Sequence, residues 1–197
     1  MKFKIFGTRI YISFLFAAVI AFLLVIDRTG LVIPTILAAI IHEIGHLLAM
    51  WACECQPKDI RLIPASIQIV RGFSKGAYSE IAIALCGPCA NLVFFGIFLL
   101  IFSYSNSQFA LTFSALNLIL CIYNLLPVSG LDGGTVLREI IAKKTDPYKA
   151  ERTVKITAFI LGILVLAAAL VLSYIGKFNI TAFIISIYLI ITSLIKR

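Results

Sequence analysis

The sequence predicts an all-α polytopic membrane protein with six transmembrane helices and one short membrane-associated loop that resembles a β-hairpin. Of its 197 residues, 61% are hydrophobic and only 13% are charged, and the mean hydropathy is +1.08. A chain of this composition has too little polar surface to cover a soluble core. The apolar residues also gather in six runs near the ~20 residues that cross a hydrocarbon core as a helix.

The six predicted spans are separated by short connections. They cover residues 10–26, 31–52, 80–103, 109–128, 154–175 and 178–195. We therefore expect residues 1–197 to form a single transmembrane domain. The basic N-terminus before the first span invites a signal-peptide interpretation. No small-residue cleavage site follows Asp27, so we expect this helix to be retained.

The basic residues sort by membrane side. All 17 lysines and arginines except Arg28 and Lys177 lie at the two termini, in the loops after the second and fourth spans, or, for Lys155, at the start of the fifth span. By the positive-inside rule, both termini are then cytoplasmic in a multi-pass protein of the cell membrane. The net charge of +8 thus reflects topology. No nucleic-acid partner is expected, because no basic patch interleaved with aromatic residues occurs.

The second span contains both histidines of the chain, in the string His42-Glu43-Ile44-Gly45-His46. Residues four apart lie on one face of a helix, so the two imidazoles project toward a common point, as two zinc ligands must. Glu43 is placed to act as general base toward water at the metal. Gly45 allows another helix to approach closely. A core-packing explanation would leave three polar groups unsatisfied in the membrane.

A catalytic zinc usually keeps three protein ligands, so a third is required. No other histidine exists, and the intramembrane cysteines have apolar neighbours. Asp132 follows the fourth span, which runs in the same direction as the second, and is expected at a depth similar to that of His46. Taken alone, Leu131-Asp132-Gly133-Gly134 indicates a helix-ending turn in which the glycines supply unusual dihedrals. Beside the histidine pair, we prefer the metal ligand.

Three motifs resemble those of the site-2 protease family of intramembrane zinc metalloproteases (M50 type). They are His42 to His46, Gly87-Pro88-Cys89-Ala90-Asn91, and Asn124-Leu125-Leu126-Pro127-Val128-Ser129-Gly130-Leu131-Asp132-Gly133-Gly134. The small size and six spans look most like the stage IV sporulation protein FB branch. The resemblance implies regulated intramembrane proteolysis of membrane-embedded or membrane-associated protein substrates near the cytoplasmic side. It also implies Zn2+ on His42, His46 and Asp132, with Asn124 near the substrate or the developing oxyanion.

Several residues allow a second interpretation. Asn124 can instead form an interhelical hydrogen bond, and Asn91 is expected chiefly to satisfy backbone groups that Pro88 frees. The loop at 60–73 is expected either to capture an extended substrate as an edge strand or to rest on the bilayer as an amphipathic loop. The string Cys86-Gly87-Pro88-Cys89 lies in an apolar span, which disfavours a redox site, and no disulfide framework is expected.

Two other functions remain open from the residues alone. In a cation transporter, His42, Glu43 and Asp132 would bind the translocated ion. An inactive scaffold related to site-2 proteases would keep the fold without the reaction. The sequence identifies no regulatory partner.

Overall fold

The computed structural model describes residues 2–5, 8–55, 57–63, 66–71, 76–176 and 179–194. It divides into two compact units, Met1–Asn124 and Leu125–Arg197. The single domain over 1–197 stays a prediction.

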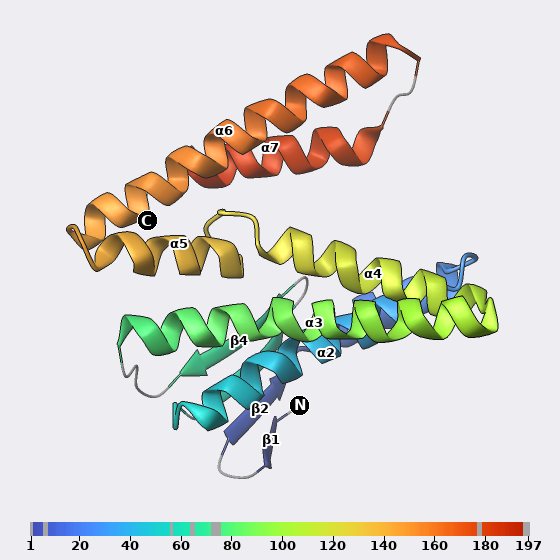
Figure 1. The fold of residues 1–197 in the computed structure, drawn as a ribbon, viewed down its shortest axis with the longest axis horizontal. Helices are drawn as coiled ribbons and strands as arrows, with labels where there is room; N and C mark the ends of the chain where they lie inside the picture. Colours follow the sequence, from blue (N-terminus) through green and yellow to red (C-terminus); the bar gives the residue numbers. More distant parts are fainter. Residues whose placement is uncertain are drawn as a thin grey trace. The chain divides into compact units, whose positions relative to one another are not determined.

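The first unit contains a four-stranded sheet in the order β1-β2-β3-β4 (Figure 1). Its strands are β1 (Lys2–Ile5), β2 (Thr8–Ile12), β3 (Pro57–Ile63) and β4 (Ser66–Arg71). The pairs β1/β2 and β3/β4 are antiparallel, whereas β2 and β3 are parallel. The β3/β4 pair overlaps the loop at 60–73. The association of this hairpin with the membrane stays a prediction.

The strands β1 and β2 correct the all-α prediction. The first span was expected to begin at residue 10, but residues 10–12 belong to β2 and the helix begins only at Phe14. Polar and apolar residues alternate in Lys2-Phe3-Lys4-Ile5, the period of a strand. An average of hydropathy over a span-length window does not detect this alternation.

An ion pair joins the N-terminal strands to the later hairpin. Nε of Arg9 donates to Oδ1 of Asp59 at 2.8 Å, and the two residues are direct register partners on β2 and β3. Asp59 is buried, so the pairing compensates a carboxylate removed from water. The ion pair therefore ties segments fifty residues apart in the sequence.

The helices of the first unit are α1 (Phe14–Ile26), α2 (Val32–Ala52), α3 (Ala77–Ser105) and α4 (Gln108–Asn124). Helices α2, α3 and α4 pack against one another (Figure 1). A Cβ atom on Gly45 would lie 2.5 Å from the backbone oxygen of Cys86. This distance confirms the predicted close approach of another helix at Gly45, and that helix is α3.

The second unit consists of α5 (Asp132–Ala142), α6 (Pro147–Tyr174) and α7 (Ile180–Leu194). Helix α6 packs on both α5 and α7, and α6 and α7 run side by side (Figure 1). Val128, Ala158 and Leu189 form its buried core. Helix α5 was not predicted from the sequence, because its Arg138 and Glu139 and its short length do not fit a span.

Each of the six predicted spans coincides with one helix within a few residues, except that α6 begins seven residues earlier. Among the described residues, α2, α3 and α6 are long and apolar enough to cross a membrane. The apolar helices α1, α4 and α7 have 13, 17 and 15 residues, which at ~1.5 Å per residue fall short of a ~30 Å hydrocarbon core. Six complete spans therefore stay a prediction.

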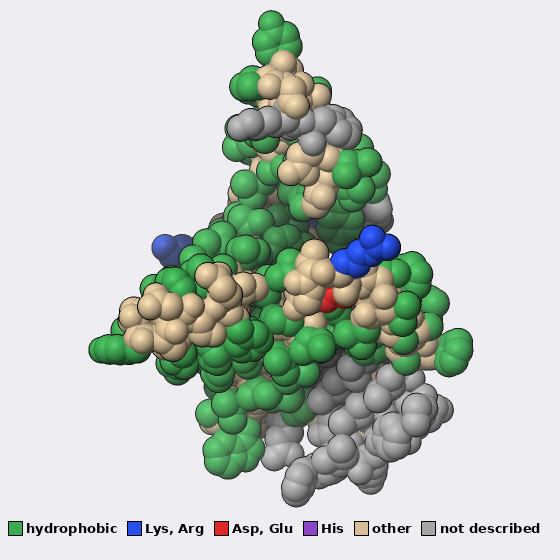
Figure 2. Space-filling model, turned by 90° about the vertical axis from the view of Figure 1, so that its right-hand side faces the viewer, with side chains coloured by type: hydrophobic (Ala, Val, Ile, Leu, Met, Phe, Trp, Pro, Cys, Tyr) green, Lys and Arg blue, Asp and Glu red, His purple; other side chains and the backbone are tan. Residues whose placement is uncertain are grey.

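Large apolar side chains are exposed along these helices. Leu24, Leu48, Leu100, Leu164 and Ile184 are examples from five of them. On the face shown in Figure 2, hydrophobic side chains predominate among the described residues, and few charged groups interrupt them. A surface of this kind suits lipid rather than water, so the chain is a membrane protein.

The turn between α1 and α2 is organised by the carboxylate of Asp27. Oδ1 accepts hydrogen bonds from the backbone N–H and the hydroxyl of Thr29 and from the N–H of Gly30, and Oδ2 accepts from the N–H of Val32 at 2.9 Å. These bonds, the one from Val32 first, lower the pKa of Asp27 from 3.8 to about 2. The carboxylate thus fixes the start of α2.

Replacing Asp27 with alanine should lower the melting temperature of the detergent-purified protein at pH 7 by about 2–4 °C, the usual effect of losing a helix cap. A group whose folded pKa is lowered contributes stability above its unfolded pKa, here 3.8, and loses it as pH falls through about 2. The difference between variant and wild type should therefore shrink over that range in thermal unfolding at a series of pH values.

Asp146 provides the matched control, because it precedes α6 without a side-chain capping bond. Asp146→Ala should melt close to wild type at every pH. A constant difference between Asp27→Ala and wild type down to pH 2 would contradict this role of the carboxylate.

Candidate metal centre

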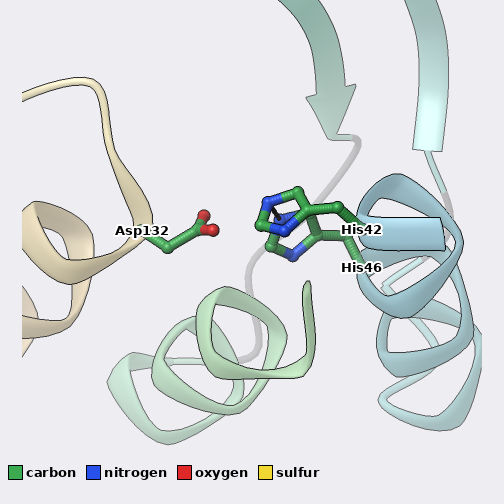
Figure 3. A group of neighbouring side chains, drawn as sticks. All are labelled: His42, His46 and Asp132. Carbon is green, nitrogen blue, oxygen red and sulfur yellow. Dashed lines mark hydrogen bonds between the residues drawn. The ribbon is translucent and has the colours of Figure 1, made fainter. Parts of the chain in front are cut away.

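His42 and His46 lie one turn apart on the buried face of α2, with exposed fractions of 6% and 8%. Their Nε2 atoms are 3.0 Å apart, and the rings are nearly perpendicular, with 4.6 Å between centroids. Figure 3 shows the two imidazoles projecting from the same face of the helix. The predicted convergence of the histidine pair is therefore observed within this unit.

The Nδ1 atom of His46 lies 2.8 Å from the backbone oxygen of Ile83 on α3. A carbonyl oxygen only accepts hydrogen bonds, so Nδ1 must carry the proton and donate it. In the neutral ring, Nε2 then presents its lone pair toward His42. The backbone of α3 thus selects the tautomer of His46.

The Nδ1 atom of His42 lies 2.7 Å from Oδ1 of Asn91. The amide nitrogen of Asn91 donates to the oxygen of Ala38 at 3.0 Å and to Oδ1 of Asn117 at 2.8 Å. Because both neighbours of this nitrogen are acceptors, the oxygen of Asn91 must be the atom that faces His42. Nδ1 of His42 therefore donates, and its Nε2 lone pair points toward His46.

Two lone pairs facing each other at 3.0 Å repel unless a proton or a metal cation lies between them. Zinc binds neutral imidazole at about 2.0–2.1 Å, so two ligands of a tetrahedral ion lie roughly 3.3 Å apart. The observed separation fits this value to within a few tenths of an ångström. The ring tautomers, the separation and the helix spacing all suit a pair of zinc ligands.

Gly87 provides the space beside the two rings. A Cβ atom at this position would overlap Nε2 of His46 and would lie 2.9 Å from Cε1 of His42. Any larger residue would push into the region between the imidazoles. This contact gives a physical reason for glycine in the string that runs from Gly87 to Asn91.

Asn91 was expected chiefly to satisfy the backbone groups that Pro88 frees, but its hydrogen bonds go elsewhere. Its described hydrogen bonds go to Ala38, His42 and Asn117, on α2 and α4, and the residue has no exposed surface. The expectation that it satisfies backbone groups of its own helix is therefore wrong. Pro88 frees groups within α3, whereas the amide points across to the neighbouring helices.

Two further predicted site residues, Glu43 and Asn124, lie in the first unit. Glu43 follows His42 on α2 and is half-buried. Asn124 ends α4, where its amide nitrogen donates to the oxygen of Leu120 at 3.0 Å. Both residues lie on α4, so this nitrogen forms a hydrogen bond within its own helix rather than the interhelical bond that was the alternative.

Asp132 lies in the second unit, as the first residue of α5; Figure 3 labels it. It begins a helix rather than ending one, which corrects the turn interpretation. Gly133 and Gly134 do not have positive φ values, whereas Gly130 does, at 95°. Cβ atoms on Gly133 and Gly134 would overlap the backbone oxygens of Leu125 and Val128. These glycines thus let the start of α5 pack on the preceding loop.

Asn117 was not predicted to belong to the site. It is fully buried on α4, and its amide nitrogen donates to the oxygen of Phe113 at 2.8 Å. One signal in the sequence pointed to it: an asparagine within an apolar span, seven residues before Asn124 and so on the same helical face. The contribution of Ile83 has no such signal, because any residue supplies a backbone oxygen.

Comparison with known proteins gives a family match. Residues 102–169 match the model described as Peptidase family M50. A zinc metalloprotease of Methanocaldococcus jannaschii is 30% identical over 164 residues, which cover 76% of this chain and 48% of that protein. A protein of Synechocystis sp., provisionally named a zinc metalloprotease, is 30% identical over 124 residues, 57% of this chain and 32% of the relative. The chain thus spans half or less of the length of these relatives.

A solved structure is also similar. The site-2 protease from Methanocaldococcus jannaschii matches with a TM-score of 0.70 and 24% identity, over 98% of this chain and 93% of that one. This similarity concerns the fold.

Replacing Gly87 with alanine should greatly reduce zinc binding, because the added methyl group would overlap Nε2 of His46 and crowd Cε1 of His42. Gly96→Ala is the matched control. Gly96 also lies on α3, and a Cβ atom there would meet no neighbouring side chain or helix within 4 Å. Zinc per chain would be measured by atomic emission on protein purified in detergent. Full zinc content in Gly87→Ala, or equal loss in both variants, would contradict this role of Gly87.

Proposed function

We propose that this chain is an intramembrane zinc metalloendopeptidase of peptidase family M50, the site-2 protease type, a proposal supported by its similarity to that family model and to a zinc metalloprotease. It cleaves membrane-embedded or membrane-associated protein substrates near the cytoplasmic side. One observation carries the proposal: two imidazoles with both Nδ1 protons committed bring their Nε2 atoms to 3.0 Å within an apolar helix bundle. Such a polar pair in a membrane protein is a functional site by default.

His42, His46 and Asp132 are the proposed zinc ligands. The two histidines supply nitrogen ligands, and a zinc site of the hydrolytic type completes its protein set with a third group. The chain has no further histidine. Asp132 is the carboxylate at the position that matches the family motif, and the close packing of Gly133 and Gly134 holds the start of α5 in a defined place.

A zinc ion held by His42, His46 and Asp132 would supply a Lewis acid that polarises the scissile carbonyl and lowers the pKa of water toward about 7. Glu43 takes the proton of the attacking water and then delivers it to the leaving amine. Asn124 has two amide hydrogens, of which the bond to Leu120 uses one. The other hydrogen can stabilise negative charge that develops on the substrate oxygen.

Strand β4 is the proposed docking edge for substrate. It pairs with β3 on one side and is last in the described sheet order. A helix hides its carbonyls in hydrogen bonds, so a protease must hold its substrate extended before cleavage. Addition of the substrate as a further strand along β4 would meet this requirement through main-chain hydrogen bonds.

The proposed topology has six spans with both termini in the cytoplasm. The distribution of lysine and arginine supports this orientation. The shorter helices α1, α4 and α7 would then reach the bilayer surfaces with help from neighbouring loop residues or local thinning. Assignment to the stage IV sporulation protein FB branch stays a prediction.

Glu43→Gln should keep one zinc per chain but lower the cleavage rate by about 10²–10⁴, because only the proton acceptor is lost. His42→Ala, His46→Ala and Asp132→Ala should lose the zinc itself. The inactive Glu43→Gln protein, purified from its native membrane, should retain uncleaved substrate that mass spectrometry identifies. Cleavage of that substrate by wild type is then followed on gels.

Glu80→Gln and Asp146→Asn change carboxylates at the starts of α3 and α6, outside the proposed ligand and base positions, and should remain fully active. A cation transporter would instead move zinc across proteoliposomes and tolerate Glu43→Gln. An inactive scaffold would bind the same proteins without cleaving them in wild type. Either result would overturn the proposed protease.

Reporter fusions test the topology. Alkaline phosphatase fused after Gly30 or Gly176 should be active, because both sites are expected outside the cell membrane. The same enzyme fused after Gly76 or Lys144 should be inactive, and green fluorescent protein after Arg197 should fluoresce. The reversed pattern would invert the orientation, and activity after Gly76 would show that α2 does not complete its span.

A further inference from the structure

We propose that Asn117 is a positioning residue for the metal centre and that it acts on His42 through Asn91. The two amides form a relay from α4 through α3 to α2, which keeps the proton of His42 on Nδ1 and leaves Nε2 for the metal. This inference rests on the proposed zinc function and names two residues that never contact the metal.

The relay begins with the orientation of the Asn117 amide. Its nitrogen donates to the backbone oxygen of Phe113, one turn earlier on α4, at 2.8 Å. That oxygen can only accept, so the nitrogen end of the amide is fixed toward it. Oδ1 of Asn117 must therefore point the other way, to the amide nitrogen of Asn91.

Asn91 passes this orientation on. One of its N–H groups donates to Asn117 and the other to the oxygen of Ala38, which lies one turn before His42. A reversed Asn91 amide would place its oxygen against two other oxygens. Its oxygen therefore stays on His42, 2.7 Å from Nδ1.

The tautomer of His42 follows from this arrangement. If the Asn91 amide reversed, its nitrogen would donate to Nδ1 and the neutral ring would carry its proton on Nε2, the proposed ligand atom. Two acceptors oppose that reversal, and Asn117 is one of them. Loss of Asn117 leaves only the Ala38 oxygen, so the ligand-competent tautomer should become less favoured and zinc affinity should fall.

A purely structural role for Asn117 is the alternative, since buried amides also join helices. The same helix offers a direct comparison. Ser114 is almost fully buried on α4, and its hydroxyl donates to the oxygen of Phe95 on α3 at 3.1 Å. It joins the same two helices, but its described hydrogen bond does not lead to His42.

The experiment measures the zinc dissociation constant of the intact, detergent-purified chain by competition with a chromogenic chelator. Asn117→Leu should bind zinc about 10- to 100-fold more weakly than wild type, as expected for a group that orients a ligand. Asn117→Asp should stay close to wild type, because burial favours the neutral carboxyl. That group still accepts from Asn91 and donates to Phe113. Ser114→Ala should melt at a lower temperature but keep its zinc affinity.

The double variant Asn91→Leu/Asn117→Leu gives a second readout. Since both residues act through His42, the double variant should bind zinc no more weakly than Asn91→Leu alone. Simple addition of the two losses would contradict the relay. Asn117→Ala replaces Asn117→Leu in both comparisons if leucine prevents folding.

Failure of the relay and failure of the proposed protease function give different results. Wild-type affinity in Asn117→Leu, while His42→Ala loses zinc, overturns the relay and leaves the protease proposal standing. Equal weakening by Asn117→Leu and Ser114→Ala shows helix packing instead of positioning. A wild-type chain that binds no zinc overturns both proposals.

Discussion

Two imidazoles held with their Nε2 atoms 3.0 Å apart impose the constraint on which the rest of this structure depends. Each ring is oriented by the hydrogen bond that its Nδ1 donates, to the backbone oxygen of Ile83 for His46 and to Oδ1 of Asn91 for His42. The facing lone pairs repel, so a proton or a metal cation between them stabilises the arrangement. The buried polar groups around the two histidines therefore act together to orient the rings toward the proposed cation.

Glycines translate that constraint into packing. Gly45 brings α2 against the backbone of α3, and Gly87 keeps a side chain out of the space beside both rings. The first glycine brings the Ile83 oxygen within reach of His46, because only closely crossing helices place a backbone acceptor near a side chain of the neighbour. In the second unit, Gly133 and Gly134 have the corresponding role for α5 and its preceding loop. Glycines thus determine where the residues that carry the proposed ligand atoms lie.

Much of this organisation was predictable from sequence. Spacing of four residues places His42 and His46 on one face, and hydropathy locates six helices, because both effects depend on local periodicity. Helix α5 and strands β1 and β2 were missed, since a short amphipathic helix and a short alternating strand give little signal beside long apolar runs. The partner of Asn91 was also missed. The choice between a backbone group of its own helix and His42 depends on how α2 and α3 cross, and side-chain spacing within α3 contains no information about that crossing.

The positions of the two asparagines on α4 connect these observations. Asn117 and Asn124 are seven residues apart, so they share one face of the helix two turns apart. Asn117 accepts a hydrogen bond from Asn91, the residue that orients His42. Asn124 is the last residue of the first unit, eight residues before Asp132 in the sequence. An apolar helix carries a buried amide only where a partner satisfies it. For Asn117 that partner is Asn91, and its exchange for an apolar group would leave an N–H of Asn91 without its acceptor inside the bundle. Without that acceptor, Asn91 keeps only its hydrogen bonds to the Ala38 oxygen and to the ring of His42. The orientation of His42 is therefore the first feature expected to change.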